Sequence, residues 1–413
     1  MKLELIKNLI QSCNLNFLIG SGISSPYLST LGNIETVLTE VEKNDNNQEN
    51  KIIRASLYKK YCEDVIFRNL VPVINKYKEE YLEKNESELV DDKYLQYKEV
   101  LESYKNLVLN INEILLFRHN NLITKQVNLF TTNIDIFLEK SLEQTNLEFN
   151  DGFKGRTNPI YDLSNFQKSY SKTSPHYDNI SEIPVFNLLK VHGSINWDKN
   201  EAGKIIYKYS AQNISNIRKE LSKIPEENFI KIVGNETYED LLLKTSEIEL
   251  DNDNIYNSFF ETYANLIVIN PTKEKFERTV LDEEYYELLR IYANSLEKEN
   301  TILFVLGFSF ADEHIRNITI RASNSNPTLQ VIIFVHKNEE QETLLSKLNN
   351  IRNNNIQFVT PRSFIDANSE IDEKQNPNKK KLNDRLKSFD CKTINDEIFR
   401  EIKNTVRYYK LTK

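Results

Sequence analysis

The chain has 413 residues, a formal net charge of −8 and a sequence pI near 5.5, with 39% hydrophobic and 28% charged residues. This balance is typical of a globular protein and argues against strong nucleic-acid binding by the chain itself, and no apolar run approaches the ~18 residues that suggest a membrane span. The length allows one large α/β domain with insertions or two domains. We expect a cytoplasmic protein, because the N-terminus lacks the apolar core and cleavage site of a signal peptide.

The cysteines exclude two kinds of site. Cys13, Cys62 and Cys391 lie far apart and form no CxxC pair, so they build neither a disulfide framework nor a four-cysteine zinc site. The 5 histidines are as widely spaced. We therefore predict that the chain has no metal site.

Short apolar runs predict the buried strands. They stand at 15–19, 127–131, 186–191, 265–269, 302–306 and 331–335. Runs that are apolar on both faces fit parallel strands, and helical periodicity between them, as at 285–299, fits crossover helices. The pattern predicts an α/β fold with a Rossmann-like, doubly wound, mostly parallel sheet.

Uneven spacing between the runs locates the insertions. A core domain is predicted over 1–365, followed at 366–413 by an exposed linker and a C-terminal helix. Within the domain we expect a helical insertion at 35–124 and loop-rich insertions at 150–183 and 199–257. The helical insertion holds Tyr77, Tyr81, Tyr94, Tyr97 and Tyr104. So many tyrosines on charged helices suggest contacts between copies of the chain.

Small or polar residues follow five successive strand candidates. These segments are GSGIS (20–24), TNID (132–135), HGS (192–194), NPT (270–272) and GFS (307–309). In open α/β sheets, ligands bind at the carboxyl ends of the strands. The five segments are therefore expected to share one ligand crevice.

The first of these loops favours an anionic ligand. Gly20 and Gly22 permit a tight turn and a close backbone approach, and a helix starting near Ser24 or Pro26 would point free N–H groups at an anion. A nucleotide pyrophosphate fits that description. Because the third glycine of GxGxxG is missing, a plain strand-to-helix turn is the alternative.

Three residues at the next two strand ends carry reactive groups. Asn133 and Asp135 alternate with Ile134, so both can face the crevice, and His192 can act as a general base. A helix N-cap is the alternative for Asn133, and a partly buried structural histidine is the alternative for His192.

Taken together, the ordered motifs resemble those of the sirtuin-like superfamily. GSGIS matches that family's GAGIS loop, TTNID (131–135) its TQNID element, VHGS (191–194) its catalytic HG, and GFS its GTS or GYS element. The resemblance spans roughly Asn14 to His336. VLGFSFADEHI (305–315) and TTNID look like the bacterial antiphage-defence branch. The family's DFR segment is replaced by SPYLSTLGN (25–33), so closure over the nicotinamide pocket is expected to differ.

The resemblance implies that NAD is the substrate, without a metal, and suggests a role for each motif residue. Asn133 would orient a water beside the nicotinamide ribose, and His192 would be the catalytic histidine. Asp135 would contact the nicotinamide side. Gly20, Ser21, Gly22 and Ser24 would hold the phosphates, and Gly307 and Ser309 would line the adenosine half. Asp312 and His314 match the defence-type pattern without an assigned role, and we interpret Asp312 as a helix N-cap.

The activity implied is that of an NAD glycohydrolase (NADase) effector of antiviral defence, acting by abortive infection. A protein deacylase is the alternative, but its zinc module needs two CxxC pairs, which this sequence lacks. A catalytically silent nucleotide sensor is a third possibility. The resemblance also implies a homo-oligomer working with a HerA-like hexameric ATPase or another phage sensor.

Overall fold

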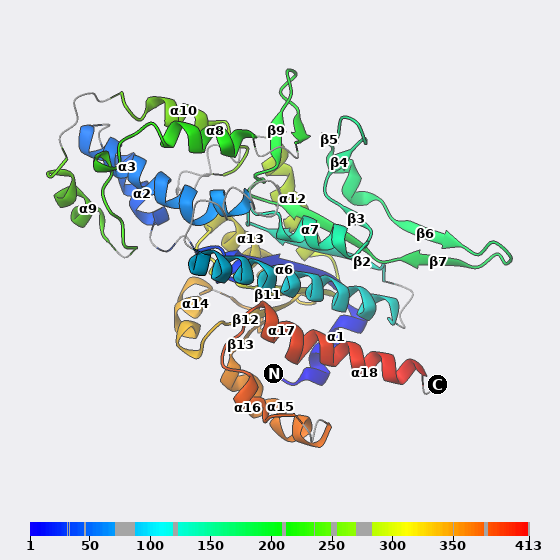
Figure 1. Ribbon diagram of the computed structural model, residues 1–413. Helices are drawn as coiled ribbons and strands as arrows, with labels where there is room; N and C mark the ends of the chain where they lie inside the picture. The colour runs from blue at the N-terminus through cyan, green and yellow to red at the C-terminus, as the bar shows by residue number, and fades with distance from the viewer. Residues whose placement is uncertain are drawn as a thin grey trace.

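The computed structural model in Figure 1 describes most of the chain. The described residues are 1–30, 32, 34–44, 47–70, 87–118, 123–208, 212–234, 236–248, 254–269, 283–349, 351–375 and 379–411. The NPT segment at 270–272 and the tyrosines at 77 and 81 lie outside these ranges.

A seven-stranded sheet forms the centre of the molecule, in the order β13-β12-β11-β1-β2-β8-β3, and every neighbouring pair is parallel. Its strands are β1 (Asn14–Ile19), β2 (Gln126–Thr131), β3 (Phe149–Asn150), β8 (Val185–Lys190), β11 (Thr301–Leu306), β12 (Gln330–Phe334) and β13 (Ile356–Val359). Strand order reverses between β1 and β11, the position at which open α/β sheets bind ligands. The predicted Rossmann-like, doubly wound sheet is confirmed.

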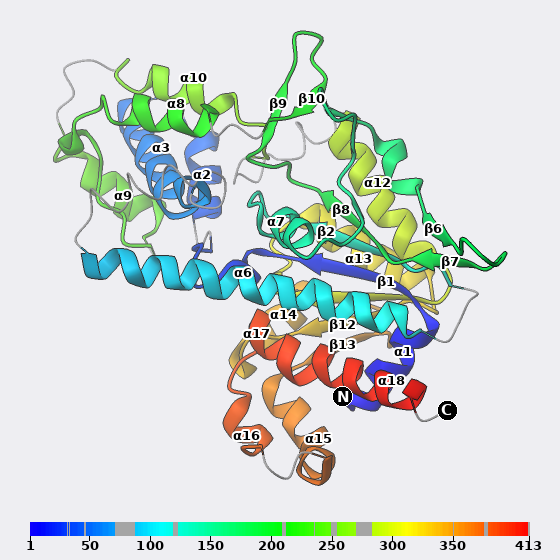
Figure 2. The same cartoon turned by 45° about the vertical axis from the view of Figure 1, so that its right-hand side comes forward.

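Helices cover both faces of the sheet, because successive side chains of a buried strand point to opposite faces. On β1, Phe17 and Ile19 join one apolar core and Leu18 joins the other. The first core is covered by α1 (Leu3–Ser12), α6 (Ser87–Leu116), α7 (Phe137–Gln144) and the C-terminal helices. The second is covered by α12 (Glu283–Glu297), α13 (Glu313–Ser325) and α14 (Gln341–Lys347). Figure 2 shows α6 running along one face with α12 and α13 behind the strands.

A separate helical module stands beyond the carboxyl ends of the strands, at the upper left of Figure 1. It consists of α2 (Ile34–Lys43), α3 (Gln48–Tyr61), α8 (Gln212–Leu221), α9 (Tyr238–Thr245) and α10 (Asn257–Ala264). Its apolar core includes Ile134 and Ile195 from the loops after β2 and β8. The segment at 199–257, which the sequence predicts to be loop-rich, contributes the helices α8 and α9 to this module, and Ile214 and Ile217 on α8 pack into its core.

Several tyrosines of the helical insertion that the structure describes face inward. Tyr97 and Tyr104 on α6 are buried and place their rings against Phe137, and Tyr58 on α3 stacks on Tyr263. Packing within one chain therefore accounts for Tyr58, Tyr97 and Tyr104, and contacts between copies of the chain stay a prediction.

Two strand predictions need correction. The run at 265–269 is not a strand of the sheet: it forms an isolated antiparallel bridge between Val268 and Gly193. On the far side of β8 from β2, β3 pairs only with Phe186 and Asn187. The sequence also did not predict β13, which pairs with β12 and forms one edge of the seven-stranded sheet.

The polar segment after Phe364 is folded over much of its length. α15 (Pro361–Gln375) includes ten residues that the sequence assigned to a linker, and its buried Asn368 accepts the N–H of Leu3 and donates to Met1 O. The segment reads as a linker because it is polar. One of its polar side chains, the amide of Asn368, is nevertheless buried and holds the start of the chain in place.

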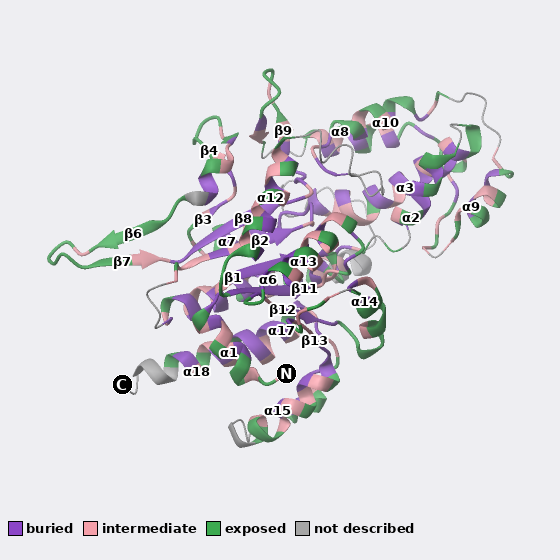
Figure 3. Cartoon of the chain, turned by 180° about the vertical axis from the view of Figure 1, so that it is seen from behind, coloured by how far each residue is buried: buried purple, intermediate pink, exposed green. Residues whose placement is uncertain are grey.

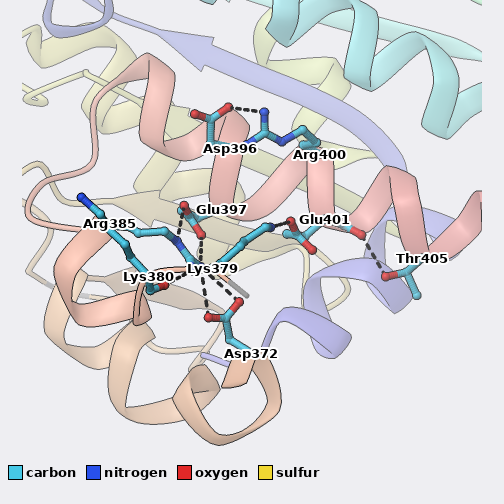
Figure 4. Close-up of polar contacts among 9 residues, drawn as sticks. All are labelled: Asp372, Lys379, Lys380, Arg385, Asp396, Glu397, Arg400, Glu401 and Thr405. Atoms are coloured by element: carbon cyan, nitrogen blue, oxygen red, sulfur yellow. Dashed lines mark hydrogen bonds and ion pairs between the residues drawn. The ribbon is translucent and has the colours of Figure 1, made fainter. Parts of the chain in front are cut away.

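The predicted C-terminal helix is confirmed as a continuous helical run. It consists of α17 (Cys391–Ile394), a π-helical turn η7 (Asn395–Phe399) and α18 (Arg400–Leu411). Arg385, at the end of α16 (Leu382–Arg385), links this run to α15 through Asp372 and Glu397, as Figure 4 shows.

The insertion at 150–183 forms short strands on one side of the molecule. A small antiparallel sheet contains β4 (Phe153–Lys154), β5 (Ile160–Tyr161), β10 (Ile205–Tyr207) and β9 (Trp197–Lys199). Between β5 and β8, β6 (Tyr170–Thr173) and β7 (Ile180–Ile183) form an antiparallel hairpin. It projects from the body of the protein and is largely exposed (Figure 3). Among the described residues no helix has the length and apolar character to span a bilayer, and this includes α6 with its 30 residues.

Candidate functional site

Four strand ends lie in one row at the carboxyl edge of the sheet. Ile19 is in register with Leu306 on one side and with Thr131 on the other, and Thr131 is in register with Lys190. The loops after β1, β2, β8 and β11 therefore leave the sheet side by side. This confirms that four of the five polar segments noted in the sequence meet at one edge.

The glycines after β1 pack directly against the loop after β11. The Gly20 N–H donates to Leu306 O at 2.9 Å, and the Gly22 N–H donates to Gly307 O at 3.0 Å. A Cβ at Gly20 would lie 2.5 Å from Gly307 O, and Gly307 has a φ of +59°, so side chains at these two positions would force the loops apart. The glycines thus join two loops of the site.

The helix expected to start near Ser24 or Pro26 does not form. Residues Ser21–Ser24 make one 3₁₀ turn, η1, and Ser25 is extended with ψ 145°, as the residue before a proline prefers. Because the Gly20 and Gly22 amides also bond within the protein, the sequence argument for a helix N-terminus directed at an anion was wrong. Ser21 and Ser309 are exposed and Gly22 and Gly307 half-buried at this edge, whereas Ser24 is buried.

A buried hydrogen-bond network lies beneath these loops. Ser24 Oγ donates to Asp135 Oδ2 at 2.8 Å and lies 2.9 Å from the hydroxyl of Tyr104. The other carboxylate oxygen of Asp135 accepts the N–H of Phe137 at 3.1 Å. Burial raises the pKa of Asp135, while Lys190 and the hydrogen bonds oppose that rise. Asp135 and Ser24 thus hold the loops together, and their contacts with a substrate stay predictions.

The amide of Asn133 has a defined orientation within this network. Its Nδ2 donates to Gly20 O at 3.1 Å and lies 3.3 Å from Ser24 Oγ and 3.4 Å from the Tyr104 hydroxyl. A carbonyl oxygen can only accept, so the NH₂ group must face Gly20. The other amide atom, Oδ1, has no hydrogen-bond partner among the described residues. It cannot rely on bulk water either, because Asn133 is only 7% exposed. Other buried amide oxygens, such as those of Asn196 and Asn395, share this property, but Asn133 Oδ1 has it at the carboxyl edge of the sheet, where a substrate hydroxyl or a water would supply the donor.

His192 is paired with a carboxylate from another loop. Its Nε2 lies 2.9 Å from Asp312 Oδ2, and both side chains are largely buried. Asp312 is also the N-cap of α13, accepting the N–H groups of His314 and Ile315, which confirms the cap predicted from the sequence. The N–H of Ile269 holds the His192 carbonyl at 3.0 Å. Nδ1 is then the ring nitrogen left to act as an acceptor when Nε2 donates to Asp312.

An ion pair that the sequence did not reveal supports the loops after β2 and β8. Lys190 Nζ lies 3.1 Å from Glu139 Oε1, with both side chains less than a tenth exposed, and Lys190 also donates to the backbone oxygen of Asp135. Burial raises the pKa of Glu139, and the nearby positive charge of Lys190 opposes that rise.

Tyr104 is the other residue of the site that sequence reasoning missed. Nothing in the spacing of residues 87–116 distinguishes it from the other tyrosines of that helix. The only signal for Lys190 was its position at the carboxyl end of an otherwise apolar strand. In the part of the chain that the structure describes, no three His, Cys, Asp or Glu side chains are grouped as metal ligands.

Comparison with known proteins agrees with this geometry. A family profile described as "SIR2-like domain" matches residues 127–358, which is more than half of the chain and includes Asn133, His192 and Asp312. No curated protein matches the sequence. The family implies binding of NAD, which the acceptor on Asn133 and the paired His192 fit. The chain therefore belongs to the SIR2-like family.

Proposed function

We propose that this chain is an NAD glycohydrolase that cleaves NAD to nicotinamide and ADP-ribose. The observation that carries the proposal is the buried Oδ1 of Asn133, which has no partner among the described residues and lies on the loop beside the one that carries His192, the partner of Asp312. Breaking the bond between ribose and nicotinamide leaves positive charge on the ribose, and attack by water completes the hydrolysis. The protein must therefore orient a water and support that charge.

Asn133 and His192 supply these two functions in the proposal. Because its NH₂ group donates to Gly20 O and lies near Ser24 Oγ, the Asn133 side chain offers the substrate side only its Oδ1. In the proposal, Oδ1 accepts a hydrogen bond from the water and so orients it. His192 accepts a ribose hydroxyl proton through Nδ1 while Asp312 stabilises the imidazolium that results. A positioned general base contributes roughly 10²–10⁴ in rate.

The test is nicotinamide release by Asn133→Ala and His192→Ala. Both variants should fold and bind NAD yet lose at least about 100-fold in kcat, the lower end of the range for a positioned acid or base. His336→Ala is the matched control, because its ring lies 3.2 Å from the carbonyl oxygen of Phe389, just before α17. Release that requires an acetylated peptide and yields an O-acetylated ribose would identify a deacylase. Binding without release would identify a nucleotide sensor.

We place this activity in bacterial antiviral defence, where it would act by abortive infection in the cytoplasm. The support is the resemblance of residues 305–315 to defence-type sirtuin-like proteins. The same resemblance suggests a homo-oligomer that is switched on by a HerA-like hexameric ATPase or another phage sensor. Light scattering on the purified chain, alone and with such a partner, tests this, and a monomer under both conditions would contradict it.

A further inference from the structure

The hydroxyl of Tyr104 reaches the site from a helix of the insertion. α6 crosses the face of the sheet, as Figure 2 shows, and Tyr104 on it is fully buried. Its ring lies parallel to that of Phe137, with 5.5 Å between the centroids and 1° between the planes. Phe137 begins α7 and donates its N–H to Asp135. The ring is thus held by packing, and its hydroxyl points into the network beneath the loops.

A second contact fixes the same turn of α6 from the C-terminal run. Asn395 is buried in η7, and its Nδ2 donates to the carbonyl oxygen of Ser103 at 2.7 Å. Ser103 directly precedes Tyr104. The position of the Tyr104 hydroxyl therefore depends on packing from two separate elements, α7 and η7.

The directions of the hydrogen bonds follow from counting protons. Ser24 has one hydroxyl proton and donates it to Asp135, so it accepts from Tyr104. Burial raises the pKa of Tyr104 well above its usual value, so the hydroxyl keeps its proton and can donate. The oxygen of Tyr104 in turn accepts from Asn133 Nδ2. The two protons of Asn133 Nδ2 have three acceptors within reach, Gly20 O at 3.1 Å, Ser24 Oγ at 3.3 Å and the Tyr104 hydroxyl at 3.4 Å. Removing this hydroxyl therefore takes the donor from Ser24 and one of the three acceptors from the Asn133 amide.

We infer that Tyr104 is a positioning residue that holds the Asn133 amide with its oxygen turned toward the substrate. The inference rests on the proposed function and extends it, because it makes the helical insertion part of the reaction site. If Tyr104 served only to pack the core, phenylalanine would replace it without a specific effect on turnover.

The test is Tyr104→Phe in the full chain, which keeps the stacked ring and removes the hydroxyl. The matched control is Tyr292→Phe, another fully buried tyrosine, whose hydroxyl lies 2.8 Å from Thr319 Oγ1 under the opposite face of the sheet. Both variants should melt at slightly lower temperature. Only Tyr104→Phe should lower kcat for nicotinamide release, by about 10-fold with KM within about 3-fold, because misplaced groups slow the chemical step. Equal kcat values for the two variants would overturn the inference.

A second readout does not depend on NAD hydrolysis. In protein labelled with ¹⁵N-asparagine, the side-chain amide signal of Asn133 is identified by its loss in Asn133→Ala. Hydrogen exchange of that amide should be faster in Tyr104→Phe than in the parent protein and in Tyr292→Phe. Unchanged exchange would overturn the positioning role. If the parent protein released no nicotinamide while exchange changed as expected, the proposed function would fail and the positioning of Asn133 would stand.

Discussion

Asp312 uses its two carboxylate oxygens for two different tasks: Oδ2 lies 2.9 Å from His192 Nε2, and Oδ1 caps α13 through the N–H of His314 at 3.0 Å. The start of a helix after β11 thereby orients a ring that follows β8. Because these strands are separated by β1 and β2 in the sheet, the pair links the two sides of the carboxyl edge.

Because Asp312 has two roles, one substitution can distinguish its negative charge beside His192 from its capping of α13. Asn caps helices about as well as Asp, so Asp312→Asn should keep α13 and change the melting temperature little. Without the carboxylate, the imidazolium of His192 loses its support, and kcat for nicotinamide release should fall about 10- to 100-fold, which is modest for a carboxylate behind a catalytic histidine. Asp390→Asn, the same change at the N-cap of α17, is the control. Equal kcat values in the two variants would show that the pair is only structural.

The sheet contains a ladder of asparagines whose loss should destabilise the fold. Asn16, Asn128, Asn187 and Asn150 are register partners across β1, β2, β8 and β3, and each adjacent pair shares an amide hydrogen bond of 2.8 to 3.0 Å. Asn128→Ala removes a partner from two neighbours and should cost about 2 kcal/mol or more of the free energy of unfolding. Asn150→Ala, at the end of the ladder, should cost about half as much. Urea unfolding measures both, and equal losses would argue against a cooperative ladder.

The buried Glu139 predicts a pH dependence of stability. Its folded-state pKa is raised, so its contribution to stability is complete below the unfolded value and is lost as pH rises through the folded value. The free energy of unfolding of the parent protein, minus that of Glu139→Gln, should therefore decrease as pH rises from about 4.5, a typical unfolded-state value. Thermal unfolding of both proteins across pH 4 to 8 measures this difference. A difference that grows with pH would mean that the ion pair with Lys190 outweighs burial.

Arg385 should stabilise the C-terminal extension more than any exposed ion pair near it. Its guanidinium lies 3.1 Å from the carboxylate of Asp372 and 2.7 Å from that of Glu397 (Figure 4). These two side chains are 13% and 10% exposed. Arg385→Ala leaves two mostly buried carboxylates near each other and should cost about 2 kcal/mol. Lys381→Ala, which breaks a 3.8 Å pair with an exposed Glu373, should change stability by less than about 0.5 kcal/mol. Denaturant midpoints of the two variants test the contrast, and similar losses would contradict it.

Local patterns in the sequence were enough to predict five of the seven strands of the sheet and the meeting of four polar loops at its carboxyl edge. Strands that are apolar on both faces can only be buried between two layers of helices, so the runs at 15–19, 127–131, 186–191, 302–306 and 331–335 indicated a doubly wound fold. Each of the loops that carry Asn133, His192 and Asp312 follows one of these strands. Parallel strands end at the same edge, and this is why residues far apart in sequence were expected together.

Only the tertiary structure showed which hydrogen bonds Asn133, His192 and Asp312 make. The pairing of His192 with Asp312, the orientation of the Asn133 amide and the contribution of Tyr104 arise from packing between segments that are 29 to 120 residues apart. The segment at 265–269 reads as a strand by composition, and the one at 366–375 reads as a linker. The structure differs at both places: Val268 forms only a bridge to Gly193, and Asn368 binds backbone groups of Met1 and Leu3. Hydrophobic periodicity therefore determined the layers, whereas hydrogen bonds between distant loops determined the site.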